Sequence, residues 1–164
     1  MGGKPRPPLT DPAWLLATWF GAGLLPVAPG TWGSLAALPF AWAIAWAGGS
    51  FALVVAAAIL FVIGCWAAER AQRASGVADD GSIVIDEIVG QWLTCAAAPL
   101  DPGAYVVAFL LFRVFDIFKP WPARWIDHNF VGGVGVMADD VIAALYGVLA
   151  LFLLRHVGGF FPGP

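Results

Sequence analysis

The sequence predicts an all-α fold, a polytopic membrane helical bundle with about four to five membrane-embedded helices. Composition is the first observation behind this prediction. Hydrophobic residues make up 60% of the 164 residues and charged residues only 12%, whereas a soluble domain has about 25% charged residues. The second observation is that apolar residues gather in runs approaching the ~20 residues of a membrane span. The mean hydropathy of +0.82 agrees with both, and the length suits one domain.

The helices are expected where apolar runs lie between polar loops. Residues 13–25 are too short and too rich in glycine for a span, so we expect an N-terminal interfacial or re-entrant helix there. The membrane-embedded segments are expected at about 35–48, 51–68, 83–99, 104–118 and 140–155. The chain then divides into a flexible N-terminus (1–12), a single membrane-embedded domain (13–157) and a C-terminal tail (158–164).

Basic residues alternate between the short loops. The loops at 47–50 and 99–104 contain no lysine or arginine. Because cytoplasmic loops are enriched in these residues, we expect 26–34, 69–82 and 119–138 to face the cytoplasm. The basic residues in or beside these polar segments are Lys4, Arg6, Arg70, Arg73, Arg113, Lys119 and Arg124.

Acidic residues gather at predicted helix ends on that same side. Ten of the eleven lie between Glu69 and Asp140. A buried carboxylate is costly unless it is paired or bound to a metal, and oxygen ligands without cysteine or a well-placed histidine favour Mg²⁺. The candidate ligands are Asp86 and Glu87 in the first turn of the third span, Asp116 in the last turn of the fourth, and Asp139 and Asp140 at the start of the last helix.

These acids also have simpler interpretations, which the sequence leaves open. Asp139 and Asp140 could serve only as helix caps. Asp116 could pair with Arg113 or Lys119, which lie three residues away on either side. The Asp-Glu pair at 86–87 could be a solvated helix start.

Two other stretches suit a phosphate group. In "FRVFDIFKPWP" (112–122), one acid lies between two bases at helical spacing, and Pro120 ends the helix. "PVAPGTWGSL" (26–35) offers backbone N–H groups and hydroxyls at the start of a helix, although an ordinary capped helix start has the same pattern. "GGVGV" (132–136) is equally ambiguous. The candidate phosphate-binding residues are Gly30, Thr31, Ser34, Arg113, Lys119 and Arg124, of which Arg124 could instead be a lipid-headgroup anchor.

Several function classes are excluded by missing patterns. No basic run indicates nucleic acid as a partner. Neither cysteine is followed by five residues and an arginine, and no Asp-x-Asp nucleophile pattern is present. His128 and His156 are the only histidines, too few for a histidine-based phosphatase, and both suit the membrane interface. Cys65 and Cys95 lie in apolar stretches and are expected to be buried thiols.

Four motifs in order resemble the phosphatidylglycerophosphatase A family over about residues 13–155. They are "GAGLLPVAPGTWGSLAALP", "GSIVIDEIVGQW", "FRVFDIFKPWPARWID" and "GGVGVMADDVIAALYG". The resemblance implies Mg²⁺-dependent removal of the terminal phosphate of phosphatidylglycerophosphate, giving phosphatidylglycerol and inorganic phosphate. It also implies a multi-pass protein of the bacterial inner membrane, with its active site facing the cytoplasm.

The resemblance assigns roles to individual residues. It places Asp86, Glu87, Arg113, Asp116 and Lys119 in catalysis, and Asp139 and Asp140 on the late Asp-Asp pair. Two positions depart from the family pattern: His128 stands where an arginine is expected, and Ala144 stands where glycine is usual. The favoured mechanism is metal-assisted in-line attack by water, with a covalent aspartyl-phosphate as an open alternative.

Two rival functions are weighed against this one. A CDP-alcohol phosphatidyltransferase pattern needs Ala-Arg after Asp-Gly-x-x, but Asp80-Gly81 is followed by "SIVI". A non-enzymatic ion carrier would place its acids near the middle of the bilayer, whereas these acids lie at predicted helix ends. The expected partners are the phospholipid substrate and the bilayer, and the sequence does not set the oligomeric state.

Overall fold

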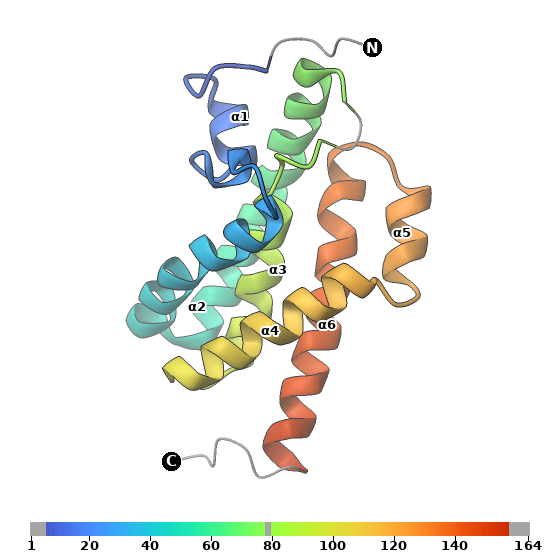
Figure 1. Ribbon diagram of the computed structural model, residues 1–164. Helices are drawn as coiled ribbons and strands as arrows, with labels where there is room; N and C mark the ends of the chain where they lie inside the picture. Colours follow the sequence, from blue (N-terminus) through green and yellow to red (C-terminus); the bar gives the residue numbers. More distant parts are fainter. Residues whose placement is uncertain (1–5, 78–79, 158–164) are drawn as a thin grey trace.

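The computed structural model describes residues 6–77 and 80–157, and every regular element in these ranges is helical. The all-α prediction is therefore confirmed for this part of the chain. The predicted tail at 158–164, residues 1–5 of the predicted N-terminus and Asp79 lie outside the described residues. Figure 1 shows the elements, which are α1 (Pro12–Ala17), the short 3₁₀ helix η1 (Ala22–Leu24), α2 (Pro29–Ser75), α3 (Ile85–Ala96), α4 (Pro102–Phe118), α5 (Ala123–Asn129) and α6 (Gly132–His156).

The long helix α2 is divided by a turn. Gly49 has a φ of 73° and a ψ of −176°, which are not helical, and glycine tolerates a positive φ at no steric cost. Residues 29–48 and 50–75 therefore form two arms. Figure 1 shows the first arm, in blue to cyan, running to the lower left, and the second returning in teal to green toward the other end of the molecule. The turn predicted at 47–50 is confirmed.

The prediction of four to five membrane-embedded helices is wrong. Two helices among the described residues, α2 and α6, are long and apolar enough to cross a membrane. The predicted span at 83–99 forms the 12-residue helix α3, which is only about 18 Å long at 1.5 Å per residue. The hydrocarbon core of a bilayer is about 30 Å thick. The predicted span at 104–118 forms α4, which has 17 residues and also falls short of a full span.

Helix α3 lies at the centre of the packing instead. Ile85, Ile88 and Val89 are almost fully buried, and the indole N–H of Trp92 donates to the carbonyl of Ala37 on α2 at 3.0 Å. Many of the surrounding buried side chains are alanines, and small residues let membrane helices approach closely. Because α3 is fixed on several sides, its first turn is held in place, and this turn carries two of the candidate acids.

The start of α6 differs from the prediction. The "GGVGV" run at 132–136 is helical, so Asp139 and Asp140 lie about two turns inside α6 and do not cap it. The N-terminal end of α6 is bound by another helix, because the carboxylate of Glu69 on α2 accepts a hydrogen bond from the Gly133 N–H at 2.8 Å. Such a contact between distant residues has no local sequence signal.

The N-terminal region also differs. Residues 13–25 form two short pieces, α1 and η1, separated by the turn at residues 18–21. Trp14 of α1 is 1% exposed, so this helix packs into the protein core. The N-cap of α2 is Ala28, with no side-chain hydrogen bond. The alternative of an ordinary start capped by a hydroxyl side chain is therefore wrong for this helix.

Candidate active site

Five segments that are distant in the sequence meet around one polar cavity of about 310 Å³. They are the start of α2, the end of α2, the start of α3 with the loop before it, the end of α4 and the interior of α6. The charged residues that line the cavity are Asp80, Asp86, Glu87, Arg113, Asp116, Lys119 and Asp140, and Gly30 lines it beside them.

Three of the five candidate metal ligands face one another. Asp86, Glu87 and Asp140 each offer an oxygen atom, and these atoms all lie within 4.8 Å of one another. One carboxylate oxygen of each is buried and has no hydrogen-bond partner among the described residues. Unpartnered carboxylate oxygens that converge in a partly buried site are the hard donors that Mg²⁺ prefers. The residues present therefore fit a divalent cation.

Arg113 connects this acidic group to α2. Its Nη1 lies 2.5 Å from Asp116 Oδ2 and 3.8 Å from Glu87 Oε1, and it donates to Ser34 Oγ at 3.4 Å. Ser34 in turn donates to the carbonyl of Gly30 at 2.9 Å. Ser34 therefore contributes by orienting Arg113. Asp116 pairs with Arg113 and does not belong to the group of three acids that face one another.

Lys119 follows α4 and is held by two different acids. Its ammonium group forms an ion pair and hydrogen bond with Asp139, and it lies 3.2 Å from Asp127 Oδ1. Burial alone would lower the pKa of Lys119, but the hydrogen bond to Asp139 and the nearby carboxylates raise the pKa above its ordinary value. Lys119 is therefore a cation at neutral pH. Of the two pairings considered for Asp116, the structure shows the one with Arg113.

Gly30 is required here for space. A Cβ atom at this position would meet the carboxylate of Glu87 and would lie 3.2 Å from Arg113 Nη1. Thr31 is not among the residues that line the cavity. Arg124 lies in a neighbouring cavity together with His128, so the structure does not bring it into the acidic site.

Two residues near the site were not among the candidate site residues: Asp127 was not considered, and Asp80 was expected to be a solvated loop residue. Asp127 pairs with Lys119 across the turn before α5, and no helical periodicity links positions separated by such a turn. Asp80 lines the cavity, with its Oδ1 accepting from the Ser82 N–H at 3.1 Å. The "DDG" sequence could have indicated this turn, because Asp often accepts a hydrogen bond from the backbone two residues on.

Comparisons with known proteins agree on one family. Residues 15–155 match the family described as Phosphatidylglycerophosphatase A. The chain is 42% identical to Phosphatidylglycerophosphatase A of Escherichia coli, over 93% of this chain and 89% of that protein. It is 41% identical to the protein of the same name from Haemophilus influenzae, over 90% and 91% of the two chains.

A third relative carries a different name. A Bacteroides thetaiotaomicron protein, provisionally named as a phosphatidylinositol-3-phosphatase, is 40% identical over 88% of this chain and 94% of its own length. No solved structure matches the chain. The family match spans nearly all of the helices that build the acidic cavity, and two relatives of the same name cover most of the chain. This chain belongs to the phosphatidylglycerophosphatase A family.

Proposed function

We propose that this protein hydrolyses the terminal phosphate of phosphatidylglycerophosphate, giving phosphatidylglycerol and inorganic phosphate in bacterial phospholipid synthesis. The observation that supports this most is the cavity in which three carboxylates face one another beside Arg113 and Lys119. Hydrolysis of a phosphomonoester uses both parts of this arrangement, since the two cations can bind its oxygens and the carboxylates would hold the metal that activates water.

Asp86, Glu87 and Asp140 are the residues that would hold Mg²⁺. When bound, Mg²⁺ neutralises charge on the phosphoryl group and lowers the pKa of water. The arrangement divides the five candidate acids into two groups. Three face one another, while Asp116 and Asp139 each pair with a cation.

Arg113 and Lys119 would bind the non-bridging oxygens of the phosphoryl group, where preorganised donors stabilise developing charge. Asp116 and Asp139 act as positioning residues, because each orients one of these two cations. Water is the preferred nucleophile, since the three remaining carboxylates are used as ligands. A carboxylate nucleophile would instead leave a phosphorylated aspartate that can be trapped by acid quenching.

The assay that tests this function measures phosphate release from phosphatidylglycerophosphate in nonionic detergent. We expect release that stops when EDTA removes the metal and resumes when excess Mg²⁺ is added. Phosphatidylinositol 3-phosphate is a useful comparison substrate because of the name of the Bacteroides relative. Turnover of that lipid alone would contradict the proposed substrate, and release of CMP from a CDP-lipid would favour the transferase alternative.

The apolar helices α2 and α6 indicate membrane association. For the finer arrangement we propose the bacterial inner membrane, with both arms of α2 and helix α6 crossing and the acidic cavity facing the cytoplasm. The basic residues support this orientation, because lysine and arginine are enriched on the cytoplasmic side of a membrane. Arg70 and Arg73 lie at the end of the second arm that is far from Gly49, so that end is the cytoplasmic one. In Figure 1 the turn between the two arms of α2 lies at the lower left, away from α5.

Cysteine labelling in intact cells tests the orientation. The background carries Cys65→Ala and Cys95→Ala, and single cysteines are placed at the exposed positions Ala47, Gly81 and Asn129. We expect a membrane-impermeant maleimide to label Ala47→Cys from outside, and Gly81→Cys and Asn129→Cys only after the cells are opened. Labelling of Gly81→Cys and Asn129→Cys from opposite sides would contradict this arrangement, because Gly81 lines the acidic cavity and Asn129 lies on α5, whose Asp127 pairs with Lys119 of that cavity.

A further inference from the structure

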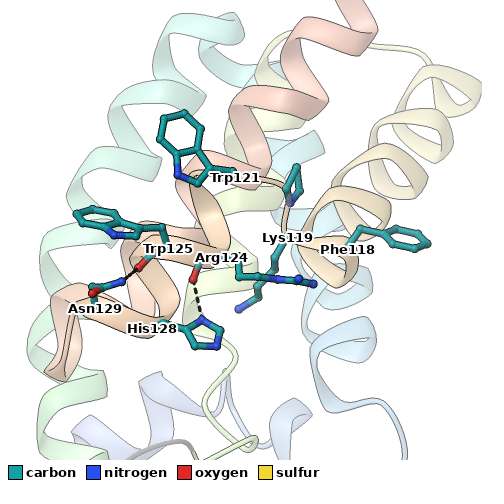
Figure 2. A pocket seen from close by; sticks show the side chains of 8 residues that line it. Phe118, Lys119, Trp121, Arg124, Trp125, His128 and Asn129 are labelled. Atoms are coloured by element: carbon teal, nitrogen blue, oxygen red, sulfur yellow. Dashed lines mark hydrogen bonds between the residues drawn. The ribbon is translucent and has the colours of Figure 1, made fainter.

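A second cavity, of about 490 Å³, adjoins the acidic one. It is formed by α5 and the turn before it, and Figure 2 shows Phe118, Trp121, Arg124 and Trp125 around it. Lys119 lines both cavities. A ligand with a charged group in the acidic cavity can therefore extend past Lys119 into the second one.

The lining of this second cavity suits a lipid headgroup at the membrane surface. Trp121 is 78% exposed and Phe118 is 70% exposed, and Trp125 is exposed beside them. Tryptophan is enriched where the bilayer meets water. Exposed rings around basic groups give a site with an apolar edge for acyl chains and positive charge for an anion.

Among the residues that the structure describes, Arg124 has no acidic partner, in contrast to Arg113. Throughout 6–77 and 80–157, its guanidinium forms no ion pair with a carboxylate. The backbone carbonyl of Arg124, by contrast, accepts a hydrogen bond from His128 Nδ1 at 2.7 Å. Figure 2 shows the Arg124 side chain extending across the cavity. A free guanidinium can bind two oxygens of a phosphate group at once.

We propose that this second cavity binds the phosphodiester group of the lipid substrate and that Arg124 is the specificity-determining residue for it. The inference rests on the proposed function, because phosphatidylglycerophosphate carries a phosphomonoester and a phosphodiester joined by one glycerol. The monoester lies in the acidic cavity, Lys119 lies between the two groups, and the diester lies against Arg124. Arg124 thus recognises the part of the substrate that remains in the product.

The variant Arg124→Ala tests this assignment with two inhibitors that each carry one half of the substrate's charge. Short-chain phosphatidylglycerol has the diester without the monoester, and inorganic phosphate resembles the departing group. In nonionic detergent, we expect Arg124→Ala to raise the KM for phosphatidylglycerophosphate and the inhibition constant of phosphatidylglycerol on the order of 10–100-fold, as expected for loss of a charged hydrogen bond. The inhibition constant of phosphate should change less than about twofold, because Arg113 and Lys119 are intact.

The matched control is Arg155→Ala, which removes the same charge in the last turn of α6 and should leave all three constants unchanged. If Arg124→Ala raised the inhibition constants of phosphate and phosphatidylglycerol equally, Arg124 would bind the departing phosphate, and the proposal would be overturned. The proposal would also be overturned if the constants of Arg124→Ala matched those of the wild type. A change in KM that appears only after phosphatidylserine is added to the micelles would assign the cavity to a bystander lipid, which also overturns it.

A binding measurement separates this proposal from the proposed function. Labelled phosphatidylglycerol should bind the purified wild-type chain in nonionic detergent and bind Arg124→Ala 10–100-fold more weakly. The conservative variant Arg124→Lys should recover part of the affinity, because lysine keeps the charge but not the two-point geometry. If the wild-type chain binds this lipid through Arg124 but releases no phosphate, the proposed function fails and the diester site remains. If it releases phosphate but Arg124→Ala binds the lipid normally, only the diester site fails.

Discussion

Replacement of Asp86 by asparagine is expected to abolish turnover while the protein stays folded and inserted. Asparagine keeps the size of the side chain but removes one of three charges that face one another within 4.8 Å. The loss should exceed the roughly 10–100-fold that changes outside the immediate ligands of a metal commonly cost, and the Mg²⁺ concentration for half-maximal activity should rise. Folding should persist, because asparagine fills the same space and can still hydrogen-bond, and because Oδ1 of the buried Asp86 carboxylate has no hydrogen-bond partner among the described residues.

The matched control for this variant is Asp101→Asn. Asp101 caps α4 by accepting a hydrogen bond from the Ala104 N–H at 2.9 Å, and asparagine caps helices about as well as aspartate. The same chemical change should therefore leave activity and stability near wild type at Asp101. Phosphate release and the thermal stability of the detergent-solubilised protein are measured for both variants across a range of Mg²⁺ concentrations. Near-normal turnover of Asp86→Asn at low Mg²⁺ would remove Asp86 from the ligand group.

The second large effect is expected at Lys119. Its ammonium group lines the acidic cavity and is held there by Asp139, so Lys119→Ala removes a preorganised donor to the phosphoryl group. Loss of such a donor commonly lowers kcat on the order of 10²–10³-fold. The KM should change much less if Lys119 acts mainly on the transition state.

A purely structural role for Lys119 makes a different prediction. Loss of the partner would leave Asp139 buried and unpaired, which costs stability, while kcat per folded molecule would be unchanged. Asp127→Asn serves as the comparison, since it removes the half-exposed partner of Lys119 and exposed pairs contribute about 0–1 kcal/mol. A stability loss with unchanged kcat for Lys119→Ala would transfer the phosphate-binding role to Arg113 alone.

The sequence predicts where the candidate residues lie on their helices better than it predicts the spans. Asp86 and Glu87 do lie in the first turn of their helix, and Asp116 lies in the last turn of its own. Local signals give these positions, because Pro120 ends one helix and turn residues precede the other. Periodicity also correctly placed Arg113 beside Asp116.

The rest depends on contacts between distant segments. An apolar run of moderate length fits a membrane span or a buried core helix equally well, and only the packing of α3 shows that it is the latter. The start of α6 was misplaced because its N-terminal end is bound by Glu69 from α2. The sequence could not indicate that Asp139 faces Lys119 while Asp140 faces Asp86 and Glu87, since adjacent side chains on a helix point about 100° apart.

The acidic cavity is lined by residues from Ala28 to Asp140, and this has a consequence for biosynthesis. The ribosome releases α2, α3 and α4 before α6, so the acids of α3 are made before Asp140 is available to them. Until α6 docks, Lys119 also lacks Asp139, and the group that would hold a cation is incomplete. We therefore expect the nascent chain to be inactive as a phosphatase until its last helix has been made and has docked.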